Sequence, residues 1–399
     1  MKRFLLTELP MQNKTIFLRV DYNVPLAKGK VADNNKIKAS LPTIKYLLQH
    51  NCKIILATHL GRPTGFSSEF SVTPLAKDLQ LLLPKQKIIK LDDCLGKKVA
   101  QAIQSGKPQT IFMLENLRFY PEEEKNDSFF AHSLASLADL YINDAFGVAH
   151  REHASVCAIT EFLPAAAGIL LETEIRSLTQ GLNPKKPSAW IMGGAKLDKI
   201  ALLERALQKY DYILIGGALA FSFLKAKGIS VGASKTDAAS IETAKKILKT
   251  KHSSKIILPL DFKVAESFSA RAKTTTVDYN QIQAQQIALD LGSKTIALFE
   301  QYLTPAKTVI WNGPLGYVEW ATFAHATKEI GRFLGKMENA ITIAGGGETA
   351  EVLIKFHLQH NLTHVSTGGG AALEFLAGAE LPALISLEKN YRKFRKRIN

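Results

Sequence analysis

The sequence predicts an α/β protein in which two parallel sheets, each flanked by helices, are joined by a hinge helix. Short apolar runs alternate with longer helix-like segments along the whole chain, which is typical of repeated βαβ units. The chain has 399 residues, and at ~150 residues per domain this length indicates two or three domains. The residues that follow the expected strands differ between the two halves, which indicates two sheets with different ligands.

Charged and polar side chains follow the expected strands of the first half. These strands are Thr15–Val20 before Asp21 and Asn23, Lys53–Ala57 before His59 and Arg62, Thr110–Leu114 before Arg118, and Leu140–Asp144 before Arg151. Lys36 stands at the start of the helix expected over Ala39–Leu48. Ligands bind at the carboxyl ends of parallel strands. Arginines placed directly after strands therefore favour a clustered site for a small anion.

Glycines follow the expected strands of the second half. These strands are Ala189–Met192 before Gly193 and Gly194, Tyr212–Ile215 before Gly216 and Gly217, Thr308–Trp311 before Asn312 and Gly313, Ile341–Ala344 before Gly345, Gly346 and Gly347, and His364–Thr367 before Gly368, Gly369 and Gly370. Such strand ends present backbone N–H groups, which suit the phosphates of a nucleotide.

The stretch Ile341–Ala350 adds a carboxylate to this pattern. Its glycines precede a helix expected from Thr349 to about Phe356, and a helix N-terminus favours a phosphate. Glu348 lies beside that phosphate site. Because the like charges repel, a cation between them is implied, and Mg²⁺ is the usual one. A glycine turn with a structural role alone is the alternative for this single stretch.

The division between the two domains is expected near Phe162–Ile175. This stretch begins as a loop at Pro164 and becomes helical from Ile169, and Asn183–Pro187 ends that helix before the second sheet. We therefore expect an N-terminal domain over residues 1–168. The hinge helix and a C-terminal domain are expected over residues 169–385.

The composition, with 46% hydrophobic and 22% charged residues, is that of an ordinary globular protein. No apolar run approaches the ~18 residues of a membrane span, and the N-terminus lacks a signal-peptide pattern. Cys52, Cys94 and Cys157 form neither a metal-ligand nor a disulfide pattern, which fits the cytoplasm. The formal net charge of +15 leaves a nucleic acid, an anionic surface and a small anionic substrate open as partners.

Known motifs narrow the activity to phosphoryl transfer. The sequence has no P-loop and no protein-kinase signature. Gly345–Ala350 matches the dinucleotide-binding pattern, but the next expected strand ends in Ser366 and Thr367, without the acid that holds the ribose. A nucleic-acid binder would interleave aromatic residues on a basic face. The activity that remains is transfer of a phosphoryl group between a nucleotide and a small anion. This reaction needs mainly positioning and charge neutralisation from the protein.

The chain resembles the phosphoglycerate kinases over its whole length. The motifs that carry the resemblance are Arg19–Pro25, His59–Pro63, Glu115–Arg118, Asn143–Gly147, Trp311–Pro314 and Ser366–Gly370. The resemblance implies reversible, Mg²⁺-dependent transfer between ATP and 3-phosphoglycerate, giving ADP and 1,3-bisphosphoglycerate, in glycolysis. It also implies a cytoplasmic monomer of two Rossmann-like domains whose tail, residues 386–399, packs on the N-terminal domain. Neither a membrane nor a nucleic acid is expected as a partner.

The resemblance also assigns site residues. Those that resemble the family's 3-phosphoglycerate site are Asp21, Asn23, Lys36, His59, Arg62, Arg118 and Arg151. Those that resemble its nucleotide site are Lys196, Gly216, Gly217, Asn312, Glu319, Gly346, Gly347, Glu348 and Thr349, with Glu348 as the metal ligand. Those that resemble groups at the transferring phosphoryl are Lys36, Lys196, Lys199, Gly369 and Gly370.

The chain departs from the family pattern in ways that bear on catalysis. Lys36 stands where the family has an arginine, and it keeps the charge but loses the planar fork. Glu348 stands where the family has an aspartate. The spacing from Lys196 to Lys199 is one residue shorter than usual. A kinase scaffold with weakened catalysis and an anion- or nucleic-acid-binding role is therefore the alternative function.

Overall fold

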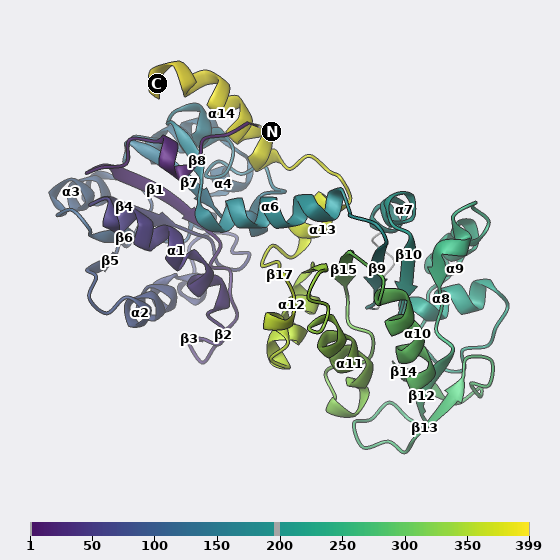
Figure 1. Cartoon of the computed structure of the whole chain (residues 1–399). Coiled ribbons are helices and arrows are strands. Elements are labelled where there is room, and N and C mark those ends of the chain that lie inside the picture. Colours follow the sequence, from purple (N-terminus) through teal and green to yellow (C-terminus); the bar gives the residue numbers. More distant parts are fainter. Residues whose placement is uncertain (1, 195–199, 399) are drawn as a thin grey trace. The chain divides into compact units, whose positions relative to one another are not determined.

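The computed structural model describes residues 2–194 and 200–398. The chain divides into two compact units, with Met1–Ile175 and Glu380–Asn399 in unit 1 and Arg176–Ala379 in unit 2. This division falls inside helix α6 (Ile169–Leu182), whereas the sequence places the expected boundary at the start of that helix. In the colours of Figure 1, unit 1 combines the purple beginning of the chain with its yellow end.

A parallel sheet of six strands forms the centre of the described part of unit 1. In sheet order the strands are β5 (Ile88–Lys90), β6 (Ile111–Met113), β4 (Lys53–Ala57), β1 (Thr15–Val20), β7 (Leu140–Asp144) and β8 (Ala165–Ala167). Its other elements include α1 (Asn35–Gln49), α2 (Thr73–Leu82), α3 (Lys97–Ser105), α4 (Pro121–Glu124), α5 (Ser128–Ala135), α14 (Pro382–Ile398) and the hairpin of β2 (Leu26–Ala27) and β3 (Lys30–Val31). The central strands are almost wholly buried, as expected for a parallel sheet covered by helices.

Strand register brings the carboxyl ends of the central strands of unit 1 to one edge. Arg19 of β1 lies opposite Ala57 of β4 and Asn143 of β7. Val20 lies opposite Asp144, the last residue of β7. The loops that follow β1, β4 and β7 therefore begin side by side, and they carry the polar residues that the sequence analysis selected.

The C-terminal helix α14 is fixed to unit 1 by a buried amide. The Nδ2 of Asn390 donates to the carbonyl oxygens of Thr160 and Leu163, at 2.5 and 2.7 Å. Its Oδ1 accepts a hydrogen bond from the backbone N–H of Ala165, the first residue of β8, at 2.9 Å. The hydrogen-bonding groups of this side chain are thus used to hold α14 against the edge strand.

Unit 2 contains a second parallel sheet, again of six strands in its described residues. In sheet order the strands are β11 (Ile256–Ile257), β10 (Tyr212–Ile215), β9 (Ser188–Met192), β15 (Thr308–Asn312), β16 (Ile341–Ala344) and β17 (His364–Val365). The helices are α7 (Ile200–Lys209), α8 (Leu219–Ala226), α9 (Ala238–Leu248), α10 (Ser293–Leu303), α11 (His325–Leu334), α12 (Gly347–Lys355) and α13 (Gly370–Leu376). The predicted α/β fold with two parallel sheets is confirmed.

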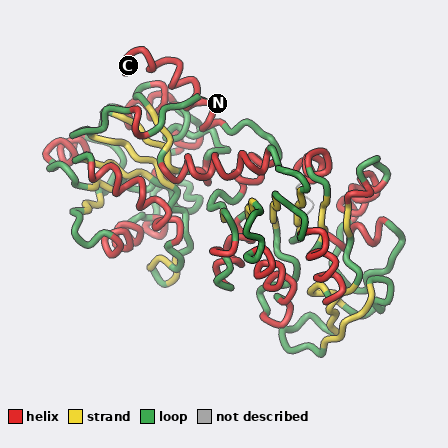
Figure 2. Tube along the Cα trace, in the orientation of Figure 1, coloured by secondary structure: helices red, strands yellow, loops and turns green. Residues whose placement is uncertain are grey.

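Unit 2 also contains a small antiparallel sheet that the sequence analysis did not identify. Its strands, in sheet order, are β13 (Thr274–Asp278), β12 (Asp261–Ala265) and β14 (Ile287–Leu291). Figure 2 shows them as yellow strands apart from the large sheet of the same unit. The strand β13 reads Thr-Thr-Thr-Val-Asp and is partly exposed, so it lacks the apolar run by which buried strands are identified.

None of the helices that the structure describes in residues 2–194 and 200–398 combines the length and the apolarity of a membrane span.

Candidate functional site

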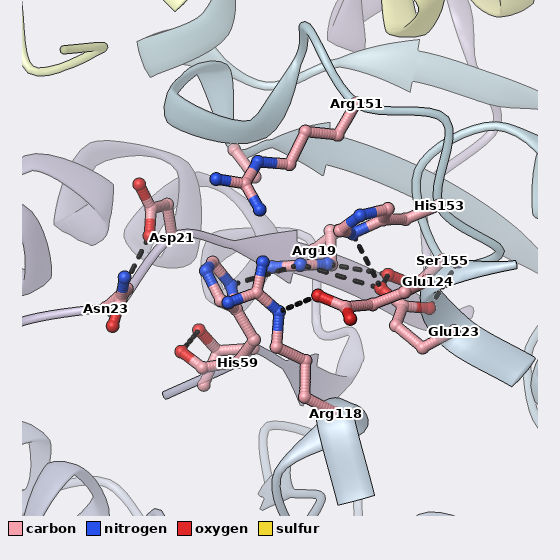
Figure 3. A network of polar contacts seen from close by, with 12 residues as sticks. Arg19, Asp21, Asn23, His59, Arg118, Glu123, Glu124, Arg151, His153 and Ser155 are labelled. Carbon is pink, nitrogen blue, oxygen red and sulfur yellow. Dashed lines mark hydrogen bonds and ion pairs between the residues drawn. The ribbon is translucent and has the colours of Figure 1, made fainter. Parts of the chain in front are cut away.

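A buried arginine lies at the centre of the polar cluster in unit 1. Arg19 is the fifth residue of β1, and its side chain is fully buried. Its Nε donates to Oγ of Ser155 at 2.7 Å, and its Nη1 donates to the carbonyl oxygen of Val20. Its Nη2 lies 3.3 Å from Nδ1 of His59. Figure 3 shows the guanidinium between His59 and Ser155.

Glu123 balances the charge of Arg19 from the other side of the cluster. The carboxylate is fully buried, and its Oε1 lies 3.8 Å from Nη2 of Arg19. It accepts hydrogen bonds from the backbone N–H of Ser155 at 2.9 Å and from the hydroxyl of Ser155 at 2.6 Å. A buried charge is tolerated when it is paired and hydrogen-bonded in this way.

The histidines of this cluster are neutral. Burial lowers the pKa of His153 to about 3, and the charges of Arg19, Arg118 and Arg151 act in the same direction. Burial and then Arg19 hold the pKa of His59 well below its usual range, although Asp21 raises it. Both imidazoles can therefore donate or accept a hydrogen bond at neutral pH without adding charge.

Arg118 offers an unused donor to a ligand. Its Nη1 donates to the carbonyl oxygen of Gly61 at 2.6 Å, and its Nε pairs with Oε1 of Glu124 at 3.0 Å. Its Nη2 is buried, and no described residue supplies a hydrogen-bond partner for it. Burial lowers the pKa of Arg118, whereas the charge of Glu124 raises it. A buried donor without a partner marks a place where an oxyanion would be stabilised.

Lys36 is paired with Asp21 at the rim of the cluster. The Nζ of Lys36 donates to Oδ2 of Asp21 at 2.9 Å and to the carbonyl oxygen of Asn23 at 3.3 Å. Burial would raise the pKa of Asp21, but Lys36, His59 and the backbone N–H of Asn23 together lower it to about 2. The Oδ1 of Asn23 accepts a hydrogen bond from the N–H of Gly61 at 3.0 Å, which ties the loop after β1 to the loop after β4.

The remaining arginines predicted for this site differ in exposure. Arg151 is partly buried, and Figure 3 shows its guanidinium directed toward the group formed by Arg19, His59 and Arg118. Arg62 is exposed on the loop after His59. The structure thus gathers Asp21, Asn23, Lys36, His59, Arg118 and Arg151 in one cluster of unit 1, with Arg62 on the loop that borders it.

The sequence analysis did not identify the residues behind this cluster, which are Arg19, Glu123, His153 and Ser155. One signal was available for Arg19, because a charged residue inside the apolar strand Thr15–Val20 must be paired once it is buried. Its partner Ser155 lies far along the chain, and only the folded structure shows that pairing.

A cavity of roughly 810 Å³ is the corresponding feature of unit 2. Its walls combine glycine turns, apolar side chains and a few charged groups, which is typical of a site for a cofactor-sized ligand. Of the residues predicted for the nucleotide, Gly217, Glu319 and Glu348 line it. The aromatic side chains of Phe268 and Tyr317 line it as well, with ring centroids 5.0 Å apart.

Close packing of backbone forms the glycine turns of this cavity. A Cβ atom at Gly193 would overlap the carbonyl oxygen of Pro314, and one at Gly313 would overlap that of Gly193. The φ of Gly313 is 85°, which lies in the left-handed region that glycine adopts without strain. These positions therefore require glycine in order to bring the ends of β9 and β15 together.

Asn312 and Thr349 support the turn that precedes α12. The Nδ2 of Asn312 donates to the carbonyl oxygen of Gly345 at 2.6 Å, and Oγ1 of Thr349 accepts from the N–H of Gly313 at 2.7 Å. Thr349 is buried, and Gly346 packs against Asn312. The structure shows these side chains engaged with the protein backbone, so their predicted contacts with a nucleotide stay a prediction.

Glu348 and Gly347 begin α12 beside the cavity. Both are exposed, and a Cβ atom at Gly347 would meet nothing within 4 Å. The Oε2 of Glu348 faces Gly194 across the cavity wall. The first N–H groups of α12 and this carboxylate therefore lie at the same place, where a phosphate and a cation would complement each other.

Several predicted residues lie away from this wall. Gly216 follows β10 and packs against Leu315. Gly369 has a φ of 52° and precedes Gly370 at the start of α13, with open space at its Cβ position. Lys196 and Lys199 lie outside the described residues, so their predicted contacts with the nucleotide phosphates stay predictions.

Asp290 is a charged group of the cavity that the sequence analysis did not identify. It is buried, and burial raises its pKa to about 7 although backbone N–H groups lower it. Its Oδ2 accepts hydrogen bonds from His325 and Ala326, at 2.7 and 3.3 Å, at the start of α11. Asp290 thus accepts from free N–H groups in the first turn of α11. It thereby stabilises the part of the cavity wall that α11 adjoins.

The described residues fit a Mg²⁺ ion that is held largely by substrate. No group of three or more His, Cys, Asp or Glu residues that could hold a metal ion occurs in the described ranges. Mg²⁺ is typically bound through one or two carboxylates together with substrate phosphates and water. The single carboxylate of Glu348 at the start of α12 meets that requirement.

The chain is similar to phosphoglycerate kinases over nearly its whole length. Residues 6–379 match the family model described as phosphoglycerate kinase. The phosphoglycerate kinase of Moorella thermoacetica is 44% identical over 392 residues, which cover 97% of this chain and 99% of that protein. The phosphoglycerate kinase of Dictyoglomus turgidum is 42% identical over 382 residues, which cover 95% and 96%.

Solved structures give the same result for the fold. The crystal structure of phosphoglycerate kinase from Pyrococcus horikoshii matches with a TM-score of 0.87 at 31% identity, covering 98% of this chain and 100% of that chain. The structure of phosphoglycerate kinase from Coxiella burnetii matches with a TM-score of 0.86 at 34% identity, covering 97% and 99%.

Proposed function

The chain belongs to the phosphoglycerate kinase family, and from this premise we propose how its residues divide the reaction of that family between the two units. The family, the fold and the activity predicted from the sequence are confirmed by these similarities. That activity is the reversible transfer of a phosphoryl group between ATP and 3-phosphoglycerate, in glycolysis. The roles of individual residues and of Mg²⁺ are the proposal.

Unit 1 binds 3-phosphoglycerate, and the observation that carries this proposal is the buried Arg118. Its Nη2 is directed into the cluster without a hydrogen-bond partner among the described residues, and guanidinium pairs well with phosphate and carboxylate oxygens. Arg151 and the exposed Arg62 add positive charge at the same edge, and His59 and Asn23 add polar groups. A substrate that carries a phosphate and a carboxylate complements this arrangement.

Unit 2 binds ATP or ADP in the cavity that contains Gly217 and Glu319. Its apolar walls suit a nucleobase, and the exposed Glu319 is a carboxylate that can accept hydrogen bonds from ribose hydroxyls. The phosphates lie toward Gly194 and the start of α12, where Gly346, Gly347 and Thr349 form the turn. Lys196 and Lys199 are proposed to neutralise the phosphates, as the family resemblance implies.

Glu348 is the proposed protein ligand of Mg²⁺. When bound, this ion neutralises phosphate charge and orients the phosphoryl group for in-line transfer. The chain's own contribution is to hold the phosphates with backbone N–H groups at the start of α12 and to place the Glu348 carboxylate beside them. The N–H groups of Gly369 and Gly370 are proposed to face the transferring phosphoryl group, as the family resemblance implies. The side chain of glutamate is longer than that of aspartate. We therefore expect Glu348→Asp to change the metal preference of the protein.

Lys36 is the proposed cation at the transferring phosphoryl group. It is already held by Asp21 in unit 1, so an incoming phosphoryl oxygen would compete with a carboxylate for the same ammonium. An arginine at this position could serve both partners through its fork. We therefore expect Lys36→Arg to raise kcat, and an unchanged kcat would contradict this role.

A cytoplasmic monomer is the proposed state of the protein. The cysteines are buried and free in the described structure, which suits a reducing compartment. Sedimentation at micromolar concentration would test the monomer directly. A dimer under those conditions would overturn it.

ADP formation by the purified protein tests the function. The assay contains ATP, Mg²⁺ and 3-phosphoglycerate, with a coupled step that removes the acyl phosphate product. Turnover that depends strictly on 3-phosphoglycerate is expected. No turnover in the parent, together with turnover in the Lys36→Arg, Glu348→Asp double variant, would indicate instead a scaffold whose chemistry has lapsed.

A further inference from the structure

The contact between Arg19 and His59 determines where the proton of His59 lies. Nη2 of Arg19 is 3.3 Å from Nδ1 of His59. A guanidinium has N–H donors and no acceptor, so Nδ1 has to accept this hydrogen bond. In a neutral imidazole one nitrogen accepts and the other carries the proton. The proton of a neutral His59 therefore lies on Nε2.

The surroundings of His59 keep it neutral. It is buried, and the cations Arg19, Arg118 and Lys36 all act on it. The anion that acts in the other direction is Asp21, which is itself paired with Lys36 at 2.9 Å. Burial and the excess of positive charge therefore both oppose a second proton on the ring.

The orientation of Arg19 is fixed by a chain of buried groups. Its Nε donates to Oγ of Ser155 at 2.7 Å, and that hydroxyl donates to Oε1 of Glu123 at 2.6 Å. The backbone N–H of Ser155 also donates to Glu123, at 2.9 Å. Arg19, Ser155 and Glu123 are all fully buried. A satisfied buried network of this kind holds one arrangement, so the guanidinium cannot turn away from His59.

We propose that Arg19 is a positioning residue that holds His59 as the neutral tautomer with its proton on Nε2, so that His59 offers the substrate an N–H donor without a charge. The inference rests on the proposed binding of 3-phosphoglycerate by unit 1. The opposite tautomer would present a lone pair to the substrate oxygens and repel them. The positive charge of the site then comes from its arginines and Lys36.

Nitrogen NMR of the parent protein tests the tautomer without reference to activity. The protein is labelled with ¹⁵N-histidine, and the His59 signals are identified by their loss in His59→Gln. A pyrrole-like Nε2 and a pyridine-like Nδ1 are expected from about pH 5.5 to pH 8, across the range in which an unperturbed imidazole titrates. A proton on Nδ1, or an imidazolium at neutral pH, would overturn the inference even if the enzyme is active.

Ser155→Ala and Arg19→Lys test the positioning role. Each removes one link in the chain, and each is expected to raise the fraction of His59 that carries its proton on Nδ1. The KM for 3-phosphoglycerate is expected to rise about 2–10-fold, which is less than the loss of a whole hydrogen bond to a charged group would cause, because only a fraction of His59 changes its tautomer. The KM for ATP is expected to stay unchanged. Ser155→Ala keeps the test available if Arg19→Lys does not fold.

Ser188→Ala is the matched control. Ser188 is also a buried serine whose hydroxyl donates to a carboxylate, that of Asp211 at 3.0 Å, but it lies in unit 2. It should leave the His59 signals and the KM for 3-phosphoglycerate unchanged. A rise in that KM in Ser155→Ala with the His59 tautomer unaltered would show that Arg19 supports the fold only, and would overturn the inference. Absence of turnover in the parent would affect the proposed function and leave the NMR result standing.

Discussion

Unit 1 and unit 2 present different kinds of groups to anionic ligands. In unit 1 the ligand groups are charged side chains, and buried partners such as Glu123 and Ser155 hold them in place. In unit 2 the cavity combines glycine turns with apolar walls, and its carboxylates Glu319 and Glu348 are exposed. The same kind of parallel sheet thus supports a site of charged side chains and a cavity in which glycine turns approach closely. The site of unit 1 should therefore be sensitive to the removal of a charge, and the cavity of unit 2 to the addition of a side-chain atom at its glycines.

The largest expected effect concerns the buried charges of unit 1. Glu123→Ala removes the partner of Arg19 and leaves that cation buried and unpaired. Breaking a buried pair in this way costs about 3–5 kcal/mol, so urea unfolding should show a loss of stability of that size. Glu122→Ala is the control, because Glu122 is the exposed neighbour in the same short helix. Its effect should stay within about 0.5 kcal/mol, and similar losses in both variants would contradict the account.

The corresponding change in unit 2 is the addition of one methyl group. Gly313→Ala introduces a Cβ that overlaps the carbonyl of Gly193, at a residue whose φ is 85°. Strained backbone of this kind costs on the order of 1–3 kcal/mol, and thermal unfolding should show the loss. Gly347→Ala adds the same methyl where nothing lies within 4 Å, and it should unfold as the parent does. Equal melting temperatures for the parent and Gly313→Ala would show that the turn is not tightly packed.

A change of substrate affinity is expected from Arg118→Met. The variant keeps the bulk of the side chain and removes hydrogen bonds to a charged ligand, which are worth about 1.5–3 kcal/mol, or roughly 10–150-fold in KM for 3-phosphoglycerate. The KM for ATP should stay unchanged, because Arg118 belongs to unit 1. Lys125→Met, at an exposed position nearby in the sequence, should alter neither value. An equal rise in both KM values for Arg118→Met would argue against separate sites.

The last expected effect is a difference in pH dependence. The folded-state pKa of His153 is lowered to about 3 from 6.5, so the unfolded chain binds the proton first and stability falls as the pH drops from about 6.5 toward 3. The pKa of Asp290 is raised to about 7 from 3.8, so stability falls as the pH rises from about 4 toward 7. His153→Asn and Asp290→Asn should remove these opposite slopes. Urea unfolding between about pH 4.5 and pH 7 measures them, and slopes of the same sign would contradict the assignment.

The central strands of the large sheets could be predicted from the sequence because they are buried and apolar, whereas the edge strands β5, β8 and β11 were not predicted. Thr15–Val20, Lys53–Ala57 and Tyr212–Ile215 occur as strands with the predicted bounds. The small sheet could not be predicted, since the threonine-rich β13 gains its order from pairing with β12 rather than from an apolar run.

Of the two sites, the residues that end strands were predictable and the residues that hold them were not. His59 and Arg118 lie in the segments that follow β4 and β6, and parallel strands bring such segments to one edge. Ser155 and Glu123 reach Arg19 through contacts between segments far apart in the chain. The position of a strand end is a local property of the sequence, whereas a buried hydrogen-bond network depends on the whole fold.

Calorimetric titration of each substrate into Arg118→Met and Gly313→Ala tests the central claim most directly. The claim is that side chains of unit 1 bind 3-phosphoglycerate and backbone turns of unit 2 bind the nucleotide. Arg118→Met should lose affinity for 3-phosphoglycerate and keep that for ADP. Gly313→Ala, studied below its melting temperature, should show the reverse. If either variant lost both affinities, or if the pattern were exchanged, the division of the reaction between the units would be wrong.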